Sequence, residues 1–156
     1  MRVYQDVLLD TTPESVKRII AETHTQNYAA LRWLQEKGAT IMGTEGSALL
    51  EEYHSLQAIV IATDEESRRD ALLNYHLKKD QLLEERDLYM VARINSTLHE
   101  GEVGLLFRGA EHNITRYLDQ DIRCCTPETL EGSLLEIVSE VERGLKGPAY
   151  IGKERV

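Results

Sequence analysis

Residues 98–109 read LHEGEVGLLFRG, and this stretch decides the fold class. Glu100 and Gly101 end a helical segment, because glycine commonly closes a helix at its C-terminus. The apolar run 103–107 is short and is bounded by glycine and polar residues, which is typical of a buried strand. A helix that passes into a buried strand without a hairpin turn is characteristic of an α/β protein.

The segments on either side continue this alternation. Residues 65–98 contain neither glycine nor proline and are rich in Glu, Lys, Arg and Leu, which predicts one long helix from about Glu65 to Leu98. Further strands are expected at 39–42 and 122–125, and further helices at 13–37 (two helices or one bent helix), from 47, through 114–118 and at 127–145. The apolar run 58–62 fits a helix or a strand. We therefore predict an α/β fold with a small, mostly parallel sheet flanked by helices. Residues 1–156 should form a single domain with a C-terminal tail from about residue 147.

The composition excludes several classes of protein. The chain of 156 residues has 18 basic and 27 acidic side chains, so its formal net charge is −9 with neutral His. Such a surface repels phosphate groups, so we expect no nucleic-acid partner and no membrane partner. No run reaches the roughly 18 apolar residues of a transmembrane helix, and the first residues lack the apolar core of a signal peptide. Because the two cysteines, Cys124 and Cys125, are adjacent and cannot build a disulfide framework, we expect a cytoplasmic protein.

Polar residues follow the two clearest strand candidates. Gly43-Thr44-Glu45 follows the run 39–42, and Gly109-Ala110-Glu111-His112-Asn113 follows the run 103–107. Ligands of an open parallel sheet bind beyond the carboxyl ends of its strands, so Glu45 and His112 should project toward one edge. A carboxylate and an imidazole can act there as a general base with its orienting partner, or as metal ligands. Gly43, Gly109, Glu111 and Asn113 are predicted to border the ligand, the glycines by allowing a close approach of the backbone.

Both of these residues also have a structural interpretation. His112 can cap or pack within the segment that follows Gly109. Glu45 can be a solvated carboxylate near the start of the helix at Ser47, where the helix dipole favours a negative charge.

Arg86 interrupts the apolar stripe of the long helix. Leu82, Met90 and Ile94 define this stripe at about 100° per residue, and both Arg86 and Asp87 fall within it. A guanidinium that points toward a core needs an anion or several carbonyl oxygens as partners. We therefore predict an Arg86–Glu45 ion pair, or one anion that bridges Arg86 and His112. The alternative is an arginine at the edge of the stripe whose stem covers apolar surface while its head reaches water.

Three short motifs occur in the order Gly43-Thr44-Glu45, Glu85-Arg86-Asp87-Leu88-Tyr89-Met90 and Gly109-Ala110-Glu111-His112. In this order they resemble the TraB/GumN/erythromycin-esterase/ChaN-like superfamily over residues 39–125. The resemblance implies a site lined by Glu, Arg and His, and the superfamily includes hydrolases, metal-dependent proteases and a haem-binding protein. Those proteins usually carry an earlier Gly-x-x-His motif, whereas His24 of this chain lacks the glycine. A site that needs both histidines would therefore be incomplete here.

Two functional hypotheses follow. The first is a hydrolase-like protein with catalytic Glu45, Arg86 and His112, in which a divalent metal is the candidate cofactor and its ligands are unknown. The second is a non-catalytic regulatory domain that binds a small anionic ligand or a metal at the same edge. The predicted helix of about 34 residues would be roughly 50 Å long, longer than a domain of this size is wide. We therefore also expect a homodimer in which part of this helix contacts the second subunit.

Overall fold

The computed structural model describes residues 1–62, 68–124 and 151–153, which form a sheet and the helices around it. The strands are β1 (Arg2–Leu9), β2 (Thr40–Glu45), β3 (Val103–Phe107), β4 (Ile122–Cys124) and β5 (Ile151–Lys153). The helices are α1 (Pro13–Glu22), α2 (Gln26–Glu36), α3 (Ser47–Ala62) and α4 (Arg68–Thr97).

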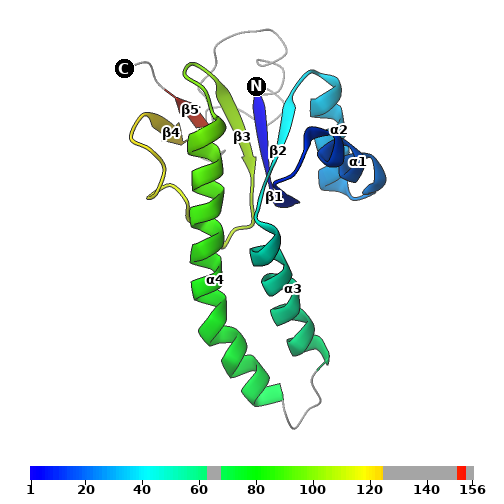
Figure 1. Ribbon diagram of the computed structural model, residues 1–156, viewed down its shortest axis with the longest axis vertical. Helices are drawn as coiled ribbons and strands as arrows, with labels where there is room; N and C mark the ends of the chain where they lie inside the picture. Colours follow the sequence, from blue (N-terminus) through cyan, green and yellow to red (C-terminus); the bar gives the residue numbers. More distant parts are fainter. Residues whose placement is uncertain (63–67, 125–150, 154–156) are drawn as a thin grey trace.

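The sheet has the strand order β2-β1-β3-β5-β4. β1 runs parallel to both of its neighbours, and Val3 pairs with Ile41 of β2 and with Leu105 of β3. β5 runs antiparallel to β3 and to β4. The predicted α/β class, with a small sheet whose β2, β1 and β3 are parallel and flanked by helices, is confirmed (Figure 1).

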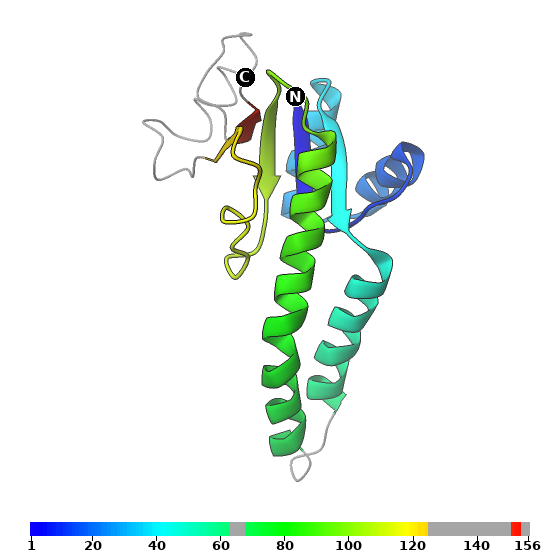
Figure 2. The same cartoon turned by 60° about the vertical axis from the view of Figure 1, so that its left-hand side comes forward.

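Helices cover both faces of the sheet, and the alternation of side chains along β1 explains why (Figure 2). Val3 points to one face and belongs to a buried cluster with residues of α1 and α2, including Ile20 and Leu31. Tyr4 points to the other face and belongs to a second cluster with residues of α4, including Met90 and Ile94. β1, which lies between β2 and β3, is therefore covered on both faces.

α4 is an unbroken helix of 30 residues, which corresponds to a length of about 45 Å. It was expected to begin near Glu65, and residues 63–67 lie outside the described part of the chain. The C-terminal half of α4 packs on the sheet, while its N-terminal half projects past the carboxyl ends of β1, β2 and β3. α3 lies beside this projecting half, so the two helices form a long hairpin (Figures 1 and 2). The ambiguous run 58–62 is the end of α3 and not a strand.

Other local predictions have mixed outcomes. The helices at 13–37 are two separate helices, and the strand near 122–125 is β4. The short helix expected through residues 114–118 does not form; residues 115–117 make a turn instead. The predicted helix 127–145 lies outside the described residues. The prediction of a tail from about residue 147 is wrong for Ile151–Lys153, since their backbone groups pair with the edges of β3 and β4.

Within the described ranges, none of the helices combines the length and the apolar character that crossing a bilayer requires.

Candidate functional site

Glu45 and Arg86 form the predicted ion pair. Glu45 is the last residue of β2, and Arg86 lies on the face of α4 that packs toward the sheet, four residues from both Leu82 and Met90. Nη2 of Arg86 donates to Oε1 of Glu45 at 2.7 Å, and Nε approaches Oε1 at 3.2 Å and Oε2 at 3.1 Å. Glu45 is fully buried and Arg86 is only 4% exposed. The alternatives of a solvated carboxylate and a surface arginine are therefore wrong.

Asp6 of β1 bridges Arg86 and His112. Its Oδ1 accepts a hydrogen bond from Nη2 of Arg86 at 2.9 Å, and its Oδ2 lies 3.2 Å from Nε2 of His112. Oδ2 also accepts the backbone N–H of Gly109 at 3.0 Å. A bridging anion between Arg86 and His112 was the alternative to the Arg86–Glu45 ion pair; the structure has the ion pair, and a side chain of the protein, Asp6, links Arg86 to His112 as well.

His112 lies between two carboxylates. Opposite Asp6, its Nδ1 is 2.5 Å from Oδ1 of Asp87, the residue that follows Arg86 on α4. Oδ2 of Asp87 accepts the backbone N–H of Asn113 at 3.0 Å, which fixes the loop after β3 against the helix. Glu45, Arg86 and His112 are thus brought into one buried network, in which Asp6 separates the first two residues from the third.

The network carries more negative than positive groups. Asp6, Glu45 and Asp87 supply three carboxylates, whereas Arg86 and a protonated His112 supply two cations. Burial alone would lower the pKa of His112, but its hydrogen bonds with Asp6 and Asp87 outweigh burial and raise the pKa. The imidazolium is therefore favoured, with both ring N–H groups donating to carboxylates.

The two carboxyl groups beside Arg86 have opposite pKa shifts. Burial raises the pKa of Glu45, and the nearby Asp6 raises it further. The guanidinium of Arg86 lowers the pKa, but not enough to offset these two effects. Burial also opposes ionisation of Asp6, yet hydrogen bonds, first of all with His112, hold its pKa well below the ordinary value. Asp6 is therefore the firmly ionised member of this pair.

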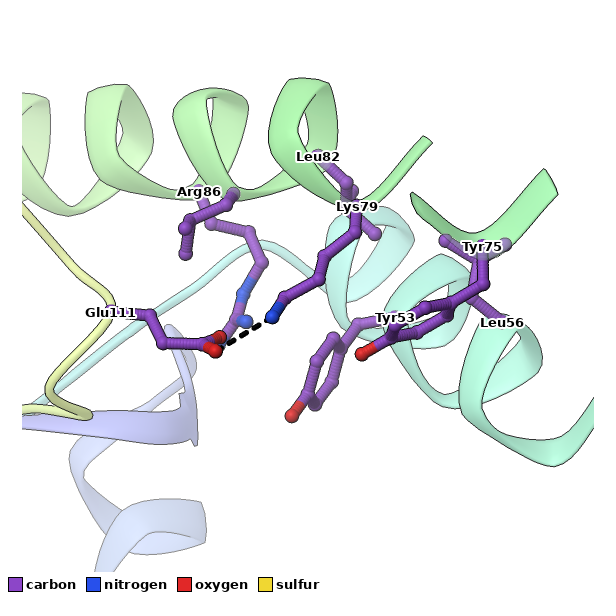
Figure 3. Close-up of a pocket in the computed structure, with 8 residues that line it drawn as sticks. Tyr53, Leu56, Tyr75, Lys79, Leu82, Arg86 and Glu111 are labelled. Atoms are coloured by element: carbon purple, nitrogen blue, oxygen red, sulfur yellow. Dashed lines mark hydrogen bonds and ion pairs between the residues drawn. The ribbon is translucent and has the colours of Figure 1, made fainter. Parts of the chain in front are cut away.

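A small pocket lies beside Arg86 at the base of the helical hairpin. Its walls include Tyr53 of α3 and Tyr75, Lys79 and Leu82 of α4 (Figure 3). The guanidinium carbon of Arg86 lies 4.3 Å from the ring centroid of Tyr53, within the range of a cation–π contact. The cavity volume is about 20 Å³, which is enough for about one water molecule. Arg86 contributes to this pocket, whereas Glu45 and His112 do not.

The four residues predicted to border a ligand have different positions. A Cβ on Gly43 would lie 1.9 Å from the carbonyl oxygen of Leu9, so this glycine serves the close packing of β2 against β1. Gly109 contacts Asp6 through its backbone N–H, and Asn113 contacts Asp87 in the same way. Glu111 is exposed, lines the pocket and forms an ion pair with Lys79, with Nζ and Oε1 2.6 Å apart (Figure 3).

The backbone is strained beside Asp6. Val7 has a φ of 61°, which is a rare conformation for a β-branched residue, and the pairing of β1 with β2 shifts register between Gln5 and Leu9. Strain of this kind costs of order 1–3 kcal/mol and persists where the surrounding structure holds it. Here it occurs next to the residue that links the two halves of the buried network.

The network does not fit a metal ion. Both ring nitrogens of His112 face carboxylates at hydrogen-bond distance, and Glu45 is engaged by Arg86. In residues 1–62, 68–124 and 151–153, no group of three or more His, Cys, Asp or Glu side chains could hold a metal ion. The divalent cofactor considered for the hydrolase hypothesis therefore has no ligand set in this part of the chain.

The sequence interpretation missed Asp6 and Tyr53. Asp6 stands two residues after Tyr4 in a mostly apolar segment, and an acid within a buried strand is a signal that could have identified it. Tyr53 has no comparable signal, because only the packing of α3 against α4 brings its ring to the guanidinium.

Comparisons with known proteins give no match for the chain, neither to a family model nor to a curated protein or a solved structure.

Proposed function

We propose that this protein is a small-ligand-binding domain without a catalytic group of its own, the second of the two hypotheses that the sequence left open. The observation that carries this proposal is the enclosure of His112. Nε2 faces Asp6 and Nδ1 faces Asp87, while the residue is only 4% exposed. An imidazole held in this way has no nitrogen left to accept a proton from a substrate or a water molecule.

Arg86 supports binding at the neighbouring pocket. Its Nε and Nη2 groups are used by Glu45 and Asp6, and the guanidinium also forms part of the pocket wall. A charged group that is fixed by two carboxylates and stacked on Tyr53 is preorganised, so little conformational entropy is lost when a ligand accepts its remaining N–H groups. The buried network in this proposal holds the binding group in place.

An NMR screen of the full chain tests this function. Mixtures of small carboxylates, amines and neutral amides are added, and the ring signals of Tyr53 and the Nε–H signal of Arg86 are followed. We expect at least one chemical class to shift both signals, whereas signals of the exposed Trp33 on α2 stay unchanged. If no class shifts them, the proposal is wrong.

The competing hydrolase hypothesis is tested on the same protein. Panels of chromogenic carboxylic and phosphoric esters should give no turnover above that of the buffer. Turnover that copurifies with the protein and is inhibited by a compound that shifts the Tyr53 signals would contradict a purely binding role. This readout needs no variant, so it does not depend on whether substitution of His112 prevents folding.

The resemblance to the TraB/GumN/erythromycin-esterase/ChaN-like superfamily remains a proposal that rests on three short motifs. Two observations fit a remote and non-catalytic relative. The motif residues Glu45, Arg86 and His112 share one network, and the chain lacks a glycine three residues before His24.

We also propose that the protein acts in the cytoplasm as a homodimer that associates through the exposed face of α4. Leu73, Leu77 and Leu88 are 60%, 69% and 47% exposed, and at about 100° per residue they lie within about 60° of one another around the helix. Tyr75 and Arg86, which line the pocket, lie about 140–180° from Leu73 and Leu77. The leucine face and the pocket are therefore on opposite sides of α4, so a second copy on this face leaves the pocket open.

A further inference from the structure

Two N–H groups of the Arg86 guanidinium are left for a hydrogen-bond acceptor on a ligand. A guanidinium has five N–H donors, and Glu45 and Asp6 take those on Nε and Nη2. Within the described part of the chain, Nη1 has no hydrogen-bond partner, and it is not among the fully buried atoms that lack one. Arg86 is one of the residues that line the pocket, so its guanidinium borders this space.

A carboxylate of the protein already occupies the mouth of this pocket. Glu111 reaches Nζ of Lys79 at 2.6 Å, and Figure 3 shows this ion pair in front of the Arg86 side chain. The side chain of Glu111 is 62% exposed and that of Lys79 is 28% exposed, and ion pairs of this kind contribute little to stability. A carboxylate from a ligand can therefore replace that of Glu111 on Lys79 at small cost and also reach Nη1 of Arg86.

A second, partly apolar pocket adjoins this position along the hairpin. Leu56 of α3 and Tyr75 of α4 line the first pocket and also a second one, which continues between the helices toward Ile59. The second pocket has a volume of about 300 Å³, the lower end of the range for ligand sites. The two pockets adjoin at Leu56 and Tyr75, and together they are called the groove. Its inner end is charged, and its outer walls combine the apolar Leu56, Tyr75 and Ile59 with the polar Asn74 and Lys78.

The charges in the groove favour a monoanion. Asp6 and Glu45 already contact Arg86, so the positive charge that remains for a ligand comes mainly from Lys79 and, further out, from Lys78. A dianion such as a phosphate ester would face two buried carboxylates, whereas a single carboxylate needs only the exchange with Glu111. The acidic net charge of the chain, −9, acts in the same direction.

We propose that the groove binds a carboxylic acid with an apolar tail. Its carboxylate lies between Nζ of Lys79 and Nη1 of Arg86, and its tail lies along Leu56 and Tyr75 toward Ile59. This inference rests on the proposed binding function and specifies its ligand class. Arg86 and Lys79 determine the selectivity for the acid group, and the leucine and tyrosine walls determine the preference for the tail.

Calorimetric titration of the full chain with butanoate, hexanoate and octanoate tests the proposal. Each methylene group that enters the groove should tighten binding about fourfold, so each step of two should lower Kd about 16-fold until the groove is filled. Hexanol tests the need for the charge, and hexyl phosphate tests the preference for a monoanion. Both should bind at least about tenfold more weakly than hexanoate.

Three variants locate the site. Lys79→Gln should weaken hexanoate binding about tenfold or more, because it removes the accessible cation. Glu111→Gln should strengthen binding, because it removes the competing carboxylate. Lys17→Gln, on the exposed surface of α1, is the matched control and should leave Kd unchanged.

The outcomes separate this inference from the proposed function. Hexanol binding as tightly as hexanoate, or hexyl phosphate binding more tightly, would overturn the carboxylic acid while leaving a ligand-binding groove. Hexanoate binding that Lys79→Gln does not affect would overturn the location. If the NMR screen also finds no class of compound that reaches Tyr53 and Arg86, the proposed function fails together with the inference.

Discussion

Glu45 accepts hydrogen bonds from two different nitrogens of Arg86, although the two residues are 41 positions apart in the sequence. This geometry matches the planar fork of a guanidinium to a carboxylate, which the ammonium of a lysine cannot reproduce. Both side chains are almost completely removed from water. The charge of each buried side chain is therefore neutralised by the other, so loss of either one should lower the free energy of unfolding.

Removal of either partner should destabilise the fold. Arg86→Ala leaves Glu45 and Asp6 buried without their cation, and the expected loss is about 3 kcal/mol or more of the free energy of unfolding. Arg86→Lys should recover only part of it. In a double-mutant cycle with Glu45→Ala, denaturant unfolding should give a coupling energy of at least about 1 kcal/mol.

Arg116→Ala is the matched control for this cycle. The side chains of Arg116 and its ion-pair partner Glu84 are both 56% exposed, with Nη2 and Oε1 3.8 Å apart. Its loss should therefore stay within about 0.5 kcal/mol. Additive effects of the Arg86 and Glu45 substitutions would contradict a direct interaction in solution.

The stability of the protein should decrease as the pH rises above neutrality. The pKa of His112 is raised in the folded state, so the folded chain binds this proton more tightly than the unfolded chain does. The resulting stabilisation is complete below about pH 6.5, the ordinary pKa of histidine, and is lost as the pH rises through the higher pKa of the folded state. Denaturant midpoints measured between pH 6 and 9 should show this decrease.

One substitution and one control test whether His112 causes this pH dependence. Asp6→Asn removes a carboxylate beside the imidazole, so NMR titration should show a lower pKa for His112 than in the unaltered chain. His24→Gln, at an exposed position, should leave the pH profile unchanged. A profile that stays the same in Asp6→Asn would show that this contact does not raise the pKa.

Val7→Gly should leave stability unchanged or increase it. Glycine in a strand ordinarily costs about 0.5–1 kcal/mol, but here it relieves a positive φ that a valine adopts only with strain. Val103→Gly in β3, where φ is negative, is the control and should lower the thermal midpoint. A loss for Val7→Gly as large as that for Val103→Gly would mean that the conformation at residue 7 carries no strain.

Sedimentation at micromolar concentration tests the proposed dimer. The full chain should sediment as two copies, and Leu73→Gln combined with Leu77→Gln should shift it to a monomer while the helical content stays the same. Trp33→Gln changes an exposed apolar residue on α2 and should leave the dimer intact. A chain that sediments only as a monomer would exclude this interface at that concentration.

The sequence by itself determined the elements whose formation depends on local chemistry. α4 follows from a stretch of strong helix formers without glycine or proline, and β2 and β3 follow from short apolar runs bounded by glycine, although β2 continues through Gly43 to Glu45. It also indicated the contact of Arg86 with Glu45 as one of the alternatives, and the structure selects this one. A guanidinium that points toward a core needs a buried partner, and Glu45 ends β2 at the carboxyl end of the parallel strands, where ligand sites form.

Only the tertiary structure decided the role of Asp6 and the state of His112. Asp6 meets Arg86 and His112 because β1 lies between β2 and β3, and because alternation along β1 turns Asp6 to the same face as Tyr4, the face that α4 covers. The position of a strand within a sheet depends on pairing between distant segments, which local sequence patterns do not encode. For the same reason the enclosure of His112, on which the choice between catalysis and binding rests, depends on β1, α4 and the loop after β3 meeting at one point.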